Sequence, residues 1–77
     1  MLRGELSIAL AIADDLRRLA PCDESGYLLA IRALVAGNDP AAAQRVYADC
    51  RRALERELGL SPSPQFEKFY RSLQESA

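Results

Sequence analysis

The residues that could carry chemistry are few and scattered along this chain of 77 residues. It contains no histidine, no glycine-rich phosphate loop, no C-x-x-C pair and no serine in a nucleophile-elbow motif. Asp14 and Asp15 are adjacent carboxylates, but neighbouring side chains on a helix diverge by about 100° and do not readily share a proton or a metal. We therefore expect no catalytic residues, no metal site and no cofactor, and we assign the two aspartates to a solvated helix face.

Cys22 and Cys50 could in principle form a disulfide. Glu5 and the pair Asp14 and Asp15 interrupt any apolar signal segment, so we expect a cytoplasmic protein, in which thiols are usually reduced. Cys50 lies on an apolar helix stripe and is expected to be a small buried hydrophobe, whereas Cys22 falls in a turn as a free thiol. The longest apolar runs, residues 9–13 and 27–31, are far shorter than the roughly 20 residues of a membrane span.

Four arginines form the one basic cluster of the sequence, and a phosphate-binding face is one interpretation of it. Three acidic residues are interleaved with them, which favours local ion pairs instead. The whole chain has 10 basic and 11 acidic residues and a net charge of −1. We therefore expect no direct nucleic-acid contact by this segment and no membrane binding. The arginines are Arg45, Arg51, Arg52 and Arg56, and the acidic residues are Asp49, Glu55 and Glu57.

The composition and periodicity predict one helical domain over residues 1–77, near the lower size limit for a single hydrophobic core. Apolar residues recur at three and four positions in segments 5–19, about 24–35, about 40–58 and from 64 onward. Asp23 and Asp39 are suited to cap the second and third helices, and Gly37 to end the second in a left-handed conformation. The segment 24–35 is apolar on nearly every side, with Arg32 its single charge between residues 27 and 36, so we expect it to be the central helix.

The first and third predicted helices are related by an offset of 34 residues. Ala9 then matches Ala43, Asp15 matches Asp49, and the pair at 17–18 matches the pair at 51–52. Thirty-four residues is the tetratricopeptide period, and Ala43 with Tyr47 supplies its small-x3-aromatic pattern. The spacing predicts an all-α fold of antiparallel tetratricopeptide-like hairpins, a right-handed array with a C-terminal capping helix. A generic four-helix bundle is the alternative.

The same offset makes the segment 5–19 the second helix of a hairpin whose first helix is not in this chain. We therefore expect its wide apolar face to be uncovered, and the chain to be the C-terminal part of a longer helical array. The isolated chain is expected to form a homodimer or to aggregate through this helix. A partner groove would lie on the segment 24–35, where Tyr27, Leu28 and Arg32 are the candidate contacts.

The segment 57–64, ELGLSPSP, is predicted to stop one helix and to start the next. Gly59 can take the left-handed conformation, Leu60 can fold back toward Leu54, and Pro62 prevents the helix from resuming. Ser63 and Pro64 then suit the cap and first position of the last helix. Its apolar stripe could dock a partner, but a terminal helix that covers the last hairpin is favoured. The stripe consists of Phe66, Phe69, Tyr70 and Leu73.

Residues 41–70, AAAQRVYADCRRALERELGLSPSPQFEKFY, resemble the bacterial transcriptional activator domain, the tetratricopeptide-like module of actinomycete antibiotic regulatory proteins and their relatives. The resemblance covers about residues 3–74 and is strongest from 37 to 70. The residues that carry it are Ala43, Val46, Tyr47, Arg51, Leu54, Glu57, Leu58, Gly59, Leu60, Pro62 and Pro64, with Phe69 and Tyr70 in the last helix.

The resemblance implies a non-catalytic module of a bacterial transcriptional regulator, which acts by protein-protein contact or oligomerisation. Its partner would be a second copy, another regulator or the transcription machinery. DNA binding would be supplied by a winged-helix domain outside this chain, because no strand-rich segment or basic recognition helix can be placed in it. A standalone tetratricopeptide-like adaptor unrelated to transcription is the alternative function.

Overall fold

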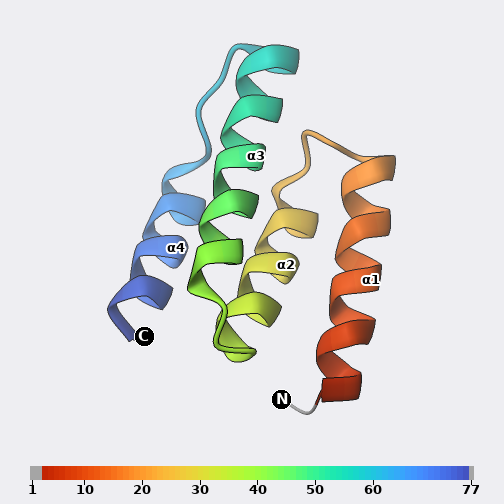
Figure 1. Cartoon of the computed structure of the whole chain (residues 1–77). Helices are drawn as coiled ribbons and strands as arrows, with labels where there is room; N and C mark the ends of the chain where they lie inside the picture. Colours follow the sequence, from red (N-terminus) through yellow and green to blue (C-terminus); the bar gives the residue numbers. More distant parts are fainter. Residues whose placement is uncertain (1–2, 77) are drawn as a thin grey trace.

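The computed structural model describes residues 3–76, so Met1, Leu2 and Ala77 of the predicted domain lie outside the described residues. Its four helices are α1 (Arg3–Leu19), α2 (Glu24–Ala36), α3 (Pro40–Leu58) and α4 (Pro64–Ser76). Each helix runs antiparallel to the one before it (Figure 1). Across residues 3–76 there is no strand, and no helix is long and apolar enough to cross a membrane. The predicted all-α fold of helical hairpins is confirmed.

Side-chain caps start three of the helices at the predicted residues. Asp23 accepts a hydrogen bond from the backbone N–H of Ser25 (2.9 Å), and Asp39 accepts one from that of Ala42 (3.2 Å). The Ser63 hydroxyl oxygen accepts from the N–H three residues later (3.1 Å), at the start of α4. Each cap satisfies a backbone donor that has no partner within its own helix, which is why these helices begin where the sequence predicts.

The two glycines at helix ends have different roles. Gly59 ends α3 with φ 66°, as predicted, and its N–H donates to the carbonyl of Glu55 (3.0 Å). The prediction for Gly37 is wrong, because its φ is −84° and the left-handed residue is Asn38, with φ 62°. Asparagine tolerates this conformation. Gly37 instead provides space, since a Cβ atom there would lie 3.3 Å from Cδ1 of Leu6 in α1.

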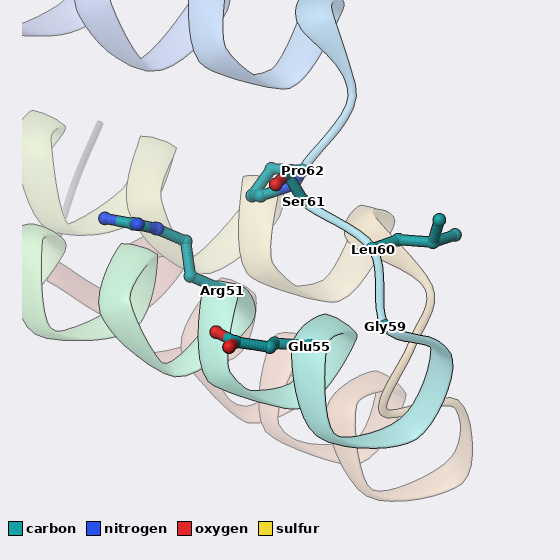
Figure 2. Close-up of a pocket in the computed structure, with 6 residues that line it drawn as sticks. All are labelled: Arg51, Glu55, Gly59, Leu60, Ser61 and Pro62. Atoms are coloured by element: carbon teal, nitrogen blue, oxygen red, sulfur yellow. The ribbon is translucent and has the colours of Figure 1, made fainter.

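Two leucines at and just after the end of α3 are not covered by the core. Leu58 and Leu60 are both more than half exposed. The Leu60 N–H does reach the carbonyl of Leu54 (3.3 Å), but the Leu60 side chain points away from α3 (Figure 2). The 19 residues of α3 span about 28 Å and the 13 of α2 about 20 Å, so the last turn of α3 extends beyond α2. Pro62, in the connection that follows, is buried.

α2 is the central helix, as predicted, and packs against α1, α3 and α4. Figure 1 shows it between α1 and α3. The two helices lie close together at Gly26, where a Cβ atom would lie 3.0 Å from Cβ of Leu16 and 3.1 Å from the backbone nitrogen of Arg17. The buried core contains Ala13 from α1, Tyr27, Ala30 and Ile31 from α2, Ala43, Val46, Cys50, Ala53 and Leu54 from α3, and Phe66 and Tyr70 from α4.

Candidate interaction surface

The polar side chains are dispersed over the surface. Within residues 3–76 there is no group of three His, Cys, Asp or Glu side chains that could hold a metal ion, and no buried charged side chain. Asp14 and Asp15 are exposed, and each pairs with an arginine on the same helix: Asp14 with Arg17 at 3.5 Å, and Asp15 with Arg18. Such exposed pairs are worth at most about 1 kcal/mol and point to a solvated face.

Both thiols are free, as expected. Cys50 is fully buried between the helices, whereas Cys22 is half-buried in the connection between α1 and α2. Burial raises the pKa of the Cys50 thiol to about 12, and the negative charges of Glu24 and Glu67 act in the same direction. A thiol with so high a pKa is a poor nucleophile at neutral pH, so Cys50 has a packing role.

Two arginines of α3 form ion pairs with acidic residues of the same helix. Arg52 pairs with Asp49 and Arg56 with Glu57, whereas the guanidinium of Arg51 extends beyond the carboxylate of Glu55 and away from it (Figure 2). A polar hollow of about 230 Å³ lies beside them at the C-terminal end of α3. The end carbonyls of a helix carry partial negative charge, and Glu55 lines the hollow, so it does not favour an anion such as phosphate. The hollow is lined by Arg51, Glu55, Gly59, Leu60, Ser61 and Pro62.

The three predicted partner contacts on α2 differ in exposure. Tyr27 is only 5% exposed, and its hydroxyl donates to the carbonyl of Pro21 (2.8 Å). Leu28 is partly buried against the core. Arg32 is exposed, with its guanidinium carbon 5.9 Å from the ring centroid of Phe69. Partner contact by these residues stays a prediction, and Arg32 is the one of the three that is already open to a partner.

The aromatic stripe of α4 packs inward. Phe66 and Tyr70 are buried, and both stack on Tyr47 of α3, at ring-centroid distances of 5.8 Å and 4.2 Å. The Tyr47 hydroxyl donates to Glu67, and burial together with this bond raises the pKa of Tyr47 to about 12. Phe69 is partly buried beside the core. This packing supports the core interpretation of the stripe over a docking site.

An apolar stripe on α1 is open to solvent. Ile8, Ile12, Leu16 and Leu19 are 63%, 48%, 39% and 84% exposed, and their spacing places them along one side of the helix. We call these four residues the α1 stripe. The predicted helix therefore has an uncovered apolar side, formed by these four residues, whereas Ala13 on the same helix is fully buried. The spacing of four residues between Ile8 and Ile12 is the sequence signal for their place on that side.

One contact between distant residues had no signal in the sequence. The carboxylate of Glu24, in the first turn of α2, accepts hydrogen bonds from both the backbone N–H and the hydroxyl of Ser63, each at 2.7 Å. A glutamate is common in the first turn of a helix because the helix dipole stabilises its negative charge. The sequence therefore does not indicate that Glu24 also binds Ser63.

Comparison with known proteins yields one match. The family model of the bacterial transcriptional activator domain matches residues 1–74. Neither the curated proteins nor the solved structures contain a match to the chain.

Proposed function

The chain belongs to the bacterial transcriptional activator domain family, and from this premise we propose that it is the non-catalytic interaction or oligomerisation module of a transcriptional regulator. Its partner is a protein: a second copy, another regulator or the transcription machinery. DNA binding is assigned to a domain outside these residues. The net charge of −1 and the acidic partners of Arg52 and Arg56 support this division of roles.

The observation that carries the proposal is the α1 stripe. Isolated exposed leucines are ordinary on a protein surface, but four large aliphatic side chains along one side of a helix form a continuous apolar patch. From their exposed fractions, covering them contributes on the order of 4–7 kcal/mol before the entropy cost of association. The α1 stripe is therefore the surface whose burial would contribute most to the free energy of binding a protein partner.

The first experiment measures self-association of the chain by size-exclusion chromatography with light scattering, from micromolar to millimolar concentration. We expect the mass of the wild-type chain to rise with concentration. The double variant Ile12→Gln, Leu16→Gln should stay monomeric with an unchanged helical circular-dichroism spectrum. The control is Leu60→Gln, which changes a leucine outside the stripe that is more exposed than Ile12 or Leu16 and should associate like the wild type.

The second experiment tests the link to transcription. The chain is fused to a DNA-binding domain that does not activate by itself, and a reporter with the matching operator is measured in bacterial cells. We expect activation that the double variant loses and Leu60→Gln keeps. Activation that is the same in all three fusions would contradict a role for the stripe. Self-association without any reporter response would instead fit the adaptor alternative.

A gel-shift assay with the 77-residue chain at low salt tests the assignment of DNA binding to another domain. We expect no shifted band, because the exposed arginines are interleaved with carboxylates. A complex that weakens steeply with added salt would show direct contact with phosphates and would overturn this part of the proposal.

A further inference from the structure

We infer that the adjoining sides of α2 and α4 form a docking surface separate from the α1 stripe, and that it binds an acidic segment of a protein partner. The surface consists of Leu28 and Arg32 from α2 and of Lys68 and Phe69 from α4, and we call these residues the α2–α4 face. The inference rests on the proposed interaction role and adds a binding site whose charge defines the partner.

Two contacts show that α2 and α4 lie side by side and run in the same direction. Their first turns are joined by the hydrogen bonds between Glu24 and Ser63. About two turns further along, the guanidinium carbon of Arg32 lies 5.9 Å from the ring centroid of Phe69. Leu28 stands one turn before Arg32 on the same side of α2 and is partly buried against the core. Apolar surface from both helices therefore adjoins the Arg32 side chain.

Lys68 is the second cation of the α2–α4 face. Its neighbour Glu67 lies on the α3 side of α4, where it binds Tyr47, and its neighbour Phe69 lies on the α2 side beside Arg32. Successive residues of a helix are about 100° apart, so Lys68 lies between the two, on the exposed side of α4 next to Phe69.

Both cations are available to a partner. Arg32 and Lys68 are exposed, and neither takes part in an ion pair between side chains of residues 3–76. Four arginines of α1 and α3 differ in this respect, because each pairs with a carboxylate of its own helix.

The carboxylates of α2 and α4 leave this surface positive. Glu24 is the acidic residue of α2, and its carboxylate binds Ser63. In α4, Glu67 binds the Tyr47 hydroxyl, and Glu75 stands two turns, about 10 Å, beyond Lys68. The α2–α4 face is therefore locally cationic on a chain whose net charge is −1.

This chemistry specifies an acidic segment that also carries a large apolar side chain. Carboxylates form charge-assisted hydrogen bonds with both Arg32 and Lys68, and contact with the Phe69 ring restricts the guanidinium before it binds. An apolar side chain next to the carboxylates would cover Leu28 and the open part of Phe69. A nucleic-acid backbone is matched by rows of Lys and Arg, whereas this surface combines two cations with apolar groups, which favours a protein segment.

Selection from a library of random short peptides displayed on phage tests the inference without assuming a sequence. The target is the Ile12→Gln, Leu16→Gln chain, so that peptides gain nothing from the α1 stripe. Peptides that also bind this chain with Arg32→Gln and Lys68→Gln added are removed. We expect the remaining peptides to be enriched in Asp and Glu and to contain at least one large apolar residue.

The affinity of an enriched peptide is then measured on the wild-type chain by fluorescence anisotropy. Arg32→Gln, Lys68→Gln should raise Kd about tenfold or more, and added salt should raise the wild-type Kd. The matched control is Arg45→Gln, Arg51→Gln, which removes two other exposed cations and should bind like the wild type. All four positions are exposed, so the circular-dichroism spectrum should be the same in each variant.

Three peptide results would overturn the inference: no enrichment, enrichment of sequences without acidic residues, or equal losses of affinity in the two double variants. Labelled single-stranded DNA is measured in the same way. Binding of this DNA that Arg32→Gln, Lys68→Gln abolishes would also overturn the inference and would assign the α2–α4 face to nucleic acid.

Failure of the inference is distinguishable from failure of the proposed function. A chain that self-associates and activates the reporter but enriches no acidic peptide would keep the interaction role and lose this docking surface. A chain that binds acidic peptides through Arg32 and Lys68 but neither associates nor activates would keep the docking surface and lose the proposed function.

Discussion

The carboxylate of Glu24 holds Ser63 by two hydrogen bonds of 2.7 Å and so fixes the start of α4 to the start of α2 across 39 residues of sequence. Ser63 also caps α4 through the N–H of Phe66. A single side chain therefore positions the helix whose aromatic residues close the core.

Glu24→Ala is expected to lower the free energy of unfolding by about 1–3 kcal/mol, because it leaves the N–H of Ser63 without its charged acceptor. The measurement is urea unfolding followed by circular dichroism. Glu55→Ala is the control, since Glu55 is exposed and makes no ion pair with Arg51; its effect should stay within about 0.5 kcal/mol. Equal effects of the two variants would mean that the Glu24 contact adds nothing to stability.

Gly26→Ala is expected to destabilise the domain although alanine is the better helix former. The new Cβ would lie about 3 Å from Leu16 and from the backbone of Arg17, and neither atom is at the end of a flexible side chain. Overpacking of this kind costs about 1–3 kcal/mol, against a propensity gain of at most about 1 kcal/mol. In the matched variant Gly4→Ala the added atom meets nothing within 4 Å, so thermal unfolding should show an unchanged or higher Tm.

Stability is expected to fall at alkaline pH. The pKa of Cys50 is raised from 9.0 to about 12 and that of Tyr47 from 10.0 to about 12. In the unfolded chain these groups lose their protons first, so deprotonation favours the unfolded state. Their contribution to stability is complete below about pH 9 and is lost as the pH rises toward 12. Thermal unfolding at a series of pH values should show a nearly constant Tm up to that point and a decline beyond it.

Cys50→Ala identifies the source of the decline. The variant removes the buried thiol and should reduce the loss of Tm between pH 9 and 11, even though it starts from a slightly lower Tm because of the atom removed. Cys22→Ala is the control and should leave the pH dependence unchanged. A decline of the same steepness in both variants would remove Cys50 as a contributor.

The two thiols are expected to react at very different rates with a disulfide reagent at neutral pH. Cys22 is half-buried in a connection and should be labelled in the native protein. Cys50 is fully enclosed and should react only as the domain unfolds, so that its rate follows the population of unfolded molecules. Mass spectrometry of the labelled chain distinguishes the two sites. Fast native labelling of Cys50 would contradict the enclosed core.

The parts of the fold that the sequence predicted depend on nearby residues. Asp23, Asp39 and Ser63 each bind an N–H two or three positions away, so their roles are fixed within one helical turn. The apolar character of α2 likewise predicted its central place. The same reasoning failed for Gly37, because a glycine that allows a left-handed turn and a glycine that allows a close helix look alike in sequence; the neighbour that decides is Leu6 in α1.

The surface was less predictable, because the length and position of neighbouring helices decide which apolar residues are covered. Leu58 lies on the same face of α3 as Leu54, and it is exposed because α2 is shorter. On α1, Ile12 and Ala13 are adjacent, but one is half exposed and the other buried, since α2 covers only one side of the helix. The Glu24 contact with Ser63 joins residues whose proximity exists only in the folded chain.

The position of α2 also determines how the domain loses its structure. In an extended repeat array each unit touches only its neighbours, and the ends can fray while the middle stays folded. Here α1, α3 and α4 all pack against the same helix, so the loss of α2 removes packing from all three and leaves only α3 and α4 joined, through the contacts of Tyr47 with Phe66 and Tyr70. The four helices therefore form a single cooperative unit, in which hydrogen exchange of α2 amides reports global unfolding.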